Sequence, residues 1–155
     1  MNFKKRFKHR PLSLSPGGVK FIRDTYGQPD ANLFAVFDDN IFDGPYCSHH
    51  THEGDPKFLG TDGLTFLTTR PILGLIFMLP PTALIEPVIK ILQDVSIHEE
   101  TVLLLIIPDF LASTVRQCLF PCFKIVQKKF SSRRSRGLLS KKTHHAYVIF
   151  VISKA

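Results

Sequence analysis

A short stretch of this chain, CSHHTHE, gathers thiol, imidazole and carboxylate groups within seven residues. These groups are the usual ligands of zinc and copper sites. A tetrahedral structural site normally takes its ligands from two separated pairs, and the sequence offers no second pair with metal-binding spacing. We therefore interpret the stretch as a polar loop, whose candidate metal ligands are Cys47, His49, His50 and His52.

Carboxylates suggest a second kind of chemistry in the same region. An acidic cleft could hold two metal ions, as in many nucleases. Such acidic runs are more often solvated loops, and this is the interpretation we adopt here. The residues concerned are Asp38, Asp39, Asp43, Asp55 and Asp62.

The charge distribution points to a polyanionic partner. The formal net charge is +7, residues 1–23 and 124–155 carry basic side chains and no acids, and all 13 acids lie between them. Nucleic-acid binding needs clustered positive charge, so it should be led by the runs KKRFKHR and KKFSSRRSRGLLSKK. A solvated tail or a nuclear-import signal would show the same pattern. The predicted nucleic-acid-binding residues are Lys128, Lys129, Arg133, Arg134, Arg136, Lys141 and Lys142.

Cysteine usage and hydropathy bear on cellular location. Cys47, Cys118 and Cys122 are an odd set without zinc-finger spacing, which is typical of a reducing compartment, and we expect Cys118 and Cys122 to be buried thiols. The basic start is followed by PLSLSPGG, without the apolar segment of a secretory signal. The longest uncharged apolar stretch, 71–85, is shorter than the roughly 20 residues of a membrane helix. We expect an intracellular protein, nuclear or cytoplasmic, without a membrane span.

The elements that must position these residues follow from the hydrophobic pattern. Short apolar runs alternate with amphipathic segments, which favours an α/β fold with a mostly parallel sheet flanked by helices. We expect a basic N-terminal arm at 1–11 and one domain at 12–155 with a basic loop at 128–142. Strands are predicted at 31–37, 72–79, 101–108 and 146–153, helices at 19–27, 82–95 and 109–120, the last with Asp109 as N-cap, and a polar loop at 38–56.

Several motifs together resemble a known family. In order they are YGQPDANLFAVFDDN, PYCS, GDPKFLGTDGLTF, IFMLPPTALIEPVIKIL, TVLLLIIPDF, LFPCF and AYVIFVIS. This series resembles the segment that follows the reverse transcriptase and RNase H domains in the Pol polyproteins of DIRS-type retrotransposons, which encode a tyrosine recombinase. The resemblance covers about residues 12–153 and depends on the order and spacing of the motifs. That segment is similar to phage-type DNA adenine methyltransferases, which implies a Rossmann-like sheet.

The resemblance makes the two adjacent prolines of IFMLPPTAL important. In those methyltransferases an Asp, Asn or Ser followed by Pro-Pro and an aromatic residue comes after a strand. The polar residue accepts hydrogens from the target amino group, and the ring stacks on the flipped base. The corresponding residues here are Leu79, Pro80, Pro81 and Thr82, which lack both the acceptor and the ring. An acceptor of this kind contributes several kcal/mol and the stacking ~1–3 kcal/mol.

Two further positions depart from the family pattern. Asn32 replaces the Asp that precedes Leu-Phe-Ala, where a strand end could bind polar groups of the cofactor, and Phe110 replaces the Trp of a Pro-x-Trp motif. After Pro81 the only glycine is Gly137, so no Gly-x-Gly cofactor loop follows the prolines.

These departures lead to a specific expectation. We expect a retrotransposon Pol-derived, methyltransferase-like domain that is catalytically inactive, has no cofactor and associates with DNA or RNA through its basic ends. One alternative is an active adenine methyltransferase that uses S-adenosylmethionine, with Asn32 as a cofactor contact. Another is a non-functional remnant of a retroelement.

Overall fold

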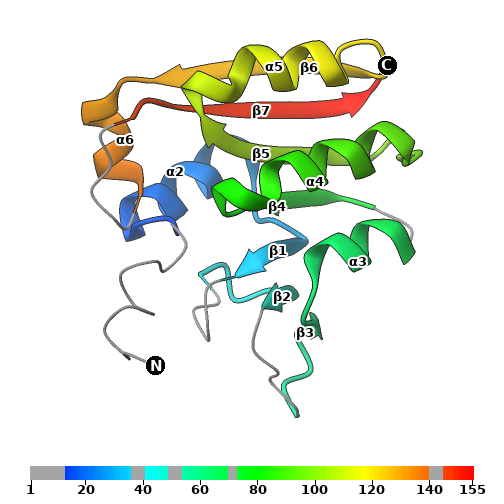
Figure 1. Ribbon diagram of the computed structural model, residues 1–155. Helices are drawn as coiled ribbons and strands as arrows, with labels where there is room; N and C mark the ends of the chain where they lie inside the picture. The colour runs from blue at the N-terminus through cyan, green and yellow to red at the C-terminus, as the bar shows by residue number, and fades with distance from the viewer. Residues whose placement is uncertain (1–12, 36–40, 49–53, 70–72, 140–144) are drawn as a thin grey trace, which may run out of the picture.

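A seven-stranded sheet forms the centre of the computed structural model, which describes residues 13–35, 41–48, 54–69, 73–139 and 145–155 (Figure 1). The strands are β1 (Ala31–Ala35), β2 (Tyr46–Ser48), β3 (Phe58–Gly60), β4 (Leu75–Met78), β5 (Val102–Pro108), β6 (Phe123–Phe130) and β7 (Tyr147–Lys154). The helices are α2 (Pro16–Tyr26), α3 (Gly63–Thr69), α4 (Thr82–Asp94), α5 (Asp109–Leu119) and α6 (Ser132–Leu138). The chain therefore has the predicted mixed α/β fold with a mostly parallel sheet.

The strands follow the order β3-β2-β1-β4-β5-β7-β6. The pairs from β3 to β5 are all parallel, whereas β7 runs antiparallel to both of its neighbours. The four predicted strands lie in one sheet, and the last of them, β7, is antiparallel to its neighbours. A parallel pair needs a crossover connection that carries the chain back to the edge where the first strand began. The link from β6 to β7 contains α6, which packs against α2, and β7 starts at the edge where β6 ends, so the two strands are antiparallel.

Helices cover the two faces of the sheet unequally. Figure 1 shows α3, α4 and α5 in front of the sheet, where α4 and α5 contribute Ile85, Val88 and Leu119 to the larger apolar cluster. Ile22 from α2 and Leu139 after α6 pack on the opposite face in a second cluster. The predicted packing of residues 84–92 across the sheet is confirmed.

Strand β5 is buried on both faces. Its run VLLLIIP alternates between the two clusters, with Leu103 and Leu105 in the larger one and Leu104 and Ile106 in the smaller one. Full burial of a Leu or Ile side chain contributes about 1.5–3 kcal/mol. This strand matches the sequence prediction because a fully apolar run is stable only where both faces are covered.

The helix boundaries show which local signals were informative. Ser15 caps α2 by accepting from the Gly18 N–H at 3.1 Å, and Gly27 ends the helix with a φ of 104°, as the predicted terminal glycine requires. Helix α5 begins as predicted, but its N-cap is Pro108, and Asp109 lies in the first turn. The expected N-cap role of Asp109 was therefore wrong.

Several elements fall where loops were predicted. The polar segment 38–56 contains β2, and β3 and α3 follow it without having been predicted. The predicted basic loop at 128–142 is replaced over much of its length by the end of β6 and by α6. Strand β6 was not predicted. It is an edge strand, and because its central residues are exposed on both faces, they show no hydrophobic alternation.

Helices α2 and α6 approach each other closely at Gly18. A Cβ at this position would lie 2.1 Å from the carbonyl oxygen of Leu138, whereas a Cβ on Gly17 would have only ordinary contacts, the nearest at 3.7 Å. Backbone bonds complete the junction, because the Ser15 N–H donates to the Leu138 carbonyl at 2.9 Å and Leu14 forms a bridge to Leu139. The start of the domain and its basic helix are thus held together.

We expect Gly18→Ala to lower the free energy of unfolding by about 1–3 kcal/mol, because the new methyl group collides with backbone rather than with a movable side chain. Gly17→Ala on the same helix is the matched control and should be neutral or slightly stabilising, since Ala is the better helix former. Urea unfolding of both variants measures the difference. Equal stabilities would contradict the close approach of α2 and α6.

Candidate functional site

The carboxyl ends of β1, β4, β5 and β6 lie at one edge of the sheet, which we call the carboxyl edge. The ends of β1, β4 and β5 share this edge because these strands are parallel. The end of β6 lies there too, because Phe130 and Pro108, the last residues of β6 and β5, both pair with Tyr147. In open α/β sheets, ligands bind outside this edge, at the point where the strand order reverses. That point lies between β1 and β4. The two prolines directly after β4 are therefore at the position where a ligand site is expected.

The prolines lead the chain out of β4 and into α4. Pro81 is the N-cap of α4, with φ −54° and ψ 148°, and Thr82 is the first helical residue. Leu79 is only 4% exposed and packs in the same cluster as Phe77 and Ile106. Thr82 is exposed. Leu79, the first residue of the tetrad Leu79-Pro80-Pro81-Thr82, is therefore a core residue. Its packing explains why an apolar side chain is accommodated there.

Asn32 does not lie at the carboxyl edge. It is the second residue of β1, pairs with Phe77 of β4 and is 3% exposed. Its Oδ1 accepts from the Phe34 N–H at 3.3 Å. The side chain predicted to contact a cofactor thus turns back onto its own strand.

Two of the candidate acids, Asp55 and Asp62, flank β3 and accept local hydrogen bonds. Asp55 accepts from the Tyr46 hydroxyl at 2.7 Å and from the Lys57 N–H at 2.9 Å. Asp62 accepts from the Leu64 N–H and the Thr65 hydroxyl at the start of α3. These bonds hold turns in place, as the interpretation of the acidic run as a loop requires. Asp38 and Asp39 lie outside the described residues.

The candidate metal ligands do not form a site in the described part of the chain. Cys47 is on β2 with its side chain in the larger core cluster, while His49, His50 and His52 lie outside the described residues. No group of three potential ligands occurs among the residues that the structure describes. The alternative interpretation of this stretch as a metal site therefore has no geometric support from the described residues.

The two C-terminal cysteines differ from the expected buried pair. Cys118 is half-buried in α5 and Cys122 is exposed. No disulfide joins the three cysteines of the chain. The prediction of two buried thiols was wrong because Cys122 follows the end of α5 and precedes the edge strand β6.

Basic side chains gather around α6 and the end of β6. Lys128 Nζ lies 5.2 Å from the ring centroid of Phe21, and Arg134 Cζ lies 5.1 Å from that of Phe130. Cations stacked on aromatic rings are held in place and keep their charge. Arg133 and Arg136 are exposed on the same short helix. We call these four cations, Lys128, Arg133, Arg134 and Arg136, the basic surface.

Lys129 is separated from the basic surface. Its Nζ lies 3.0 Å from Asp109 Oδ2, at the start of α5 on the other face of the sheet. Among the described residues, no carboxylate lies within ion-pair distance of the basic surface. Nearby Lys20 is paired with Asp24, and this hydrogen bond raises the pKa of Lys20. Lys141 and Lys142 lie outside the described residues.

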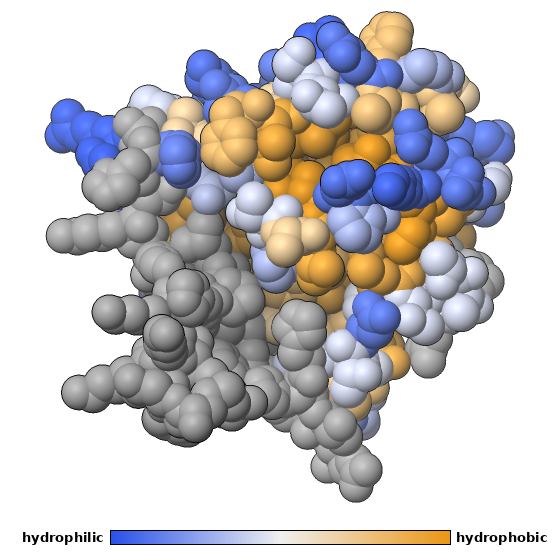
Figure 2. Space-filling model, in the orientation of Figure 1, coloured by the Kyte–Doolittle hydropathy of each residue, from blue (hydrophilic) through white to orange (hydrophobic). Residues whose placement is uncertain are grey.

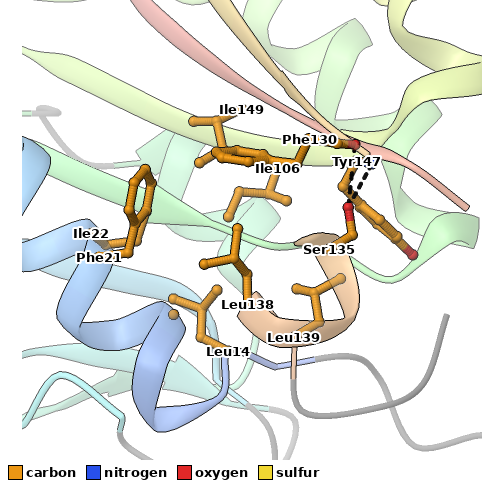
Figure 3. Close-up of a pocket in the computed structure, with 11 residues that line it drawn as sticks. Leu14, Phe21, Ile22, Ile106, Phe130, Ser135, Leu138, Leu139, Tyr147 and Ile149 are labelled. Atoms are coloured by element: carbon orange, nitrogen blue, oxygen red, sulfur yellow. Dashed lines mark hydrogen bonds between the residues drawn. The ribbon is translucent and has the colours of Figure 1, made fainter. Parts of the chain in front are cut away.

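Ser135 fixes α6 at the carboxyl edge (Figure 3). Its hydroxyl accepts from the Tyr147 N–H at 3.1 Å and donates to the Phe130 carbonyl at 3.4 Å. The pocket drawn there, between α2, α6 and the sheet, has a volume of about 10 Å³ and a mainly apolar lining. Such a space is about the size of one water molecule, so it is a packing gap and not a ligand site.

Sequence reasoning missed two features of this region. The pairing of Leu14 with Leu139 places the segment before α2 beside the end of α6, although they are far apart in sequence. The order β5-β7-β6 places the basic surface at the carboxyl edge. Neither feature produces a pattern within one segment of the sequence, because both depend on which distant segments become neighbours in the fold.

Comparisons with known proteins are informative only about the fold. No protein-family model matches the chain, and no curated protein matches it in sequence. Its structure is similar to that of precorrin 8W decarboxylase from Methanobacterium thermoautotrophicum, with a TM-score of 0.56 and 10% sequence identity over 93% of this chain and 94% of that chain. At this identity the likeness extends to the α/β architecture alone. No helix in the described ranges is long and apolar enough to cross a membrane.

We expect Leu79→Asn to lower the free energy of unfolding by at least about 2 kcal/mol, because an amide would replace an apolar side chain in a packed cluster. Thr82→Asn is the matched control within the same tetrad and should change stability by no more than about 0.5 kcal/mol, because Thr82 is exposed. Chemical denaturation measures both. A Leu79→Asn variant as stable as the wild type would show that this side chain is not part of the core.

Proposed function

We propose that this chain is a catalytically inactive, methyltransferase-like domain that associates with nucleic acid. The sheet order supports the first part of the proposal. It differs from the 3-2-1-4-5-6 order of dinucleotide-binding sheets by one antiparallel strand placed between β5 and β6. That arrangement is typical of S-adenosylmethionine-dependent methyltransferases.

The burial of Leu79 carries the proposal that catalysis is absent. A methyltransferase of the resembled family needs a hydrogen-bond acceptor at this position, exposed to the target amino group. Leu79 has no acceptor in its side chain and is packed in the core, and Thr82 offers no ring for stacking. Two separate contributions to transition-state binding are therefore missing at one site.

The described strand ends supply no acidic residue for S-adenosylmethionine. Nucleotide-like ligands of such sheets usually have their ribose hydroxyls bound by an acidic residue at a strand end. The described ends of β1, β2 and β4 are Ala35, Ser48 and Met78. Asn32, the remaining candidate, bonds to its own strand. We derive no catalytic step through this cofactor.

The basic surface supports association with nucleic acid. Its four cations have no described ion-pair partner, and they lie at the carboxyl edge, where ligands of α/β sheets bind. Such cations neutralise phosphates without reading sequence. The motif order supports an origin in a DIRS-type Pol polyprotein, in which binding to nucleic acid would be useful without catalysis.

A second candidate function is an active DNA adenine methyltransferase. One specific observation favours it, namely that Pro80 and Pro81 lie at the switch point of the sheet, as the resembled tetrad would. The two candidates differ in cofactor binding, because an enzyme of this class must bind S-adenosylmethionine.

We expect the protein neither to bind S-adenosylmethionine in a calorimetric titration nor to transfer a labelled methyl group from it to DNA that contains adenine. The missing acceptor and ring account for the lack of transfer, and the described strand ends, which carry no acidic residue, account for the lack of cofactor binding. Transfer that Pro80→Ala abolishes, while Pro87→Ala within α4 leaves it intact, would instead establish the enzyme.

We expect binding to duplex DNA to be indifferent to sequence, with a slope of log K against log salt of about −3 if roughly half of the seven predicted cations engage. Replacing Arg133, Arg134 and Arg136 together with Ala should weaken binding to every sequence by a similar factor, because each lost phosphate contact removes about 0.9 from the slope.

The matched control replaces three exposed cations outside α6 with Ala, namely Lys57, Arg116 and Lys154. It changes the net charge by the same amount as the first triple variant. It should leave the slope close to that of the wild type. If the two triple variants behave alike, binding depends on total charge and not on the basic surface. Fluorescence anisotropy at several salt concentrations measures all three proteins.

A further inference from the structure

Phe110 is an exposed aromatic ring at the carboxyl edge. It lies in the first turn of α5, directly after β5, and is 60% exposed. Its ring borders the outer groove between α4 and α5, beside Thr82 and Leu111. Figure 2 shows apolar surface along this face of the molecule, interrupted by hydrophilic side chains. Because the ring projects outward, the core does not require it.

The surroundings of Phe110 are fixed by backbone and ring contacts. The N–H of Asp109 donates to the Ala146 carbonyl at 2.8 Å, which places the segment before β7 beside the start of α5. The ring of His145 lies 5.1 Å from that of Phe110 at an interplanar angle of 63°. This tilted contact leaves at least one face of Phe110 open. Lys129 is paired with Asp109, and Glu86 of the same groove is paired with Lys90, so both described carboxylates near the ring have a cationic partner.

Phe110 and the basic surface lie at the same edge of the sheet but on opposite faces. Pro108 and Phe130 pair with the same residue, Tyr147, so the residues that follow β5 and β6 leave the sheet at one level, with β7 between them. An exposed aromatic ring that shares an edge of the sheet with a group of cations can bind single-stranded nucleic acid, because phosphates contact the cations while an unpaired base elsewhere on the same strand stacks on the ring.

We infer that Phe110 is a base-stacking residue and that the preferred ligand of the carboxyl edge is single-stranded nucleic acid. This inference rests on the proposed association with nucleic acid and adds its strandedness. Stacking needs a base that is not paired, whereas the basic surface alone would bind a duplex equally well. Phe120, at the opposite end of α5, is 62% exposed and provides a matched comparison.

The test uses the full chain and a single-stranded DNA of mixed sequence, about 16 nucleotides long, with its duplex as the second probe. Phe110→Ala should weaken binding of the single strand by about 5- to 150-fold, the effect of losing one stacked base. It should leave the salt slope and duplex binding unchanged, because no charge is removed. Phe120→Ala should have no effect on either probe.

Fluorescence gives an independent measurement, because the chain contains no Trp. Phe110→Trp introduces a single indole that should still bind the single strand and be quenched when it does, whereas Phe120→Trp should not be quenched. If the wild type binds through the basic surface but Phe110→Ala changes nothing and Phe110→Trp is not quenched, the stacking inference is wrong and the proposed association stands. If the wild type binds neither probe, the proposed association itself is wrong.

Discussion

The burial of β5 on both faces is the constraint on which the rest of the structure depends. A strand of this composition is stable only between two covering layers, and it forces α4 and α5 onto one face and α2 with the α6 segment onto the other. It also sets the position of β4 on one side and of β7 on the other. The close junction of α2 and α6 at Gly18 contributes to this, since these elements cover the second face together with Phe42.

The same arrangement collects the functional candidates at one edge. Parallel strands end together, so the prolines after β4, Phe110 after β5 and the basic helix after β6 share an edge although they are widely separated in sequence. The antiparallel β7 lies between β5 and β6 and starts from that edge. Charge and aromatic surface are thus brought together by topology, without any local motif that combines them.

The prolines after β4 have a structural role that follows from their backbone chemistry. They still end the strand and start α4, because two fixed φ angles and two missing donors suit neither a strand interior nor a late helical position. The side chain before them is part of the apolar core, and the one after them is an exposed Thr. A turn of this kind depends only on backbone geometry.

The sequence by itself determined the elements whose signals are local. The apolar run of β5, the amphipathic pattern of α4 and the terminal Gly27 of α2 are each a signal that lies within one segment. Only the tertiary structure decided the direction of β7, the existence of the exposed edge strand β6, the burial of Leu79 and the separation of Lys129 from the basic surface. These features depend on which segments become neighbours, and contacts between segments distant in the chain leave no periodicity within either of them.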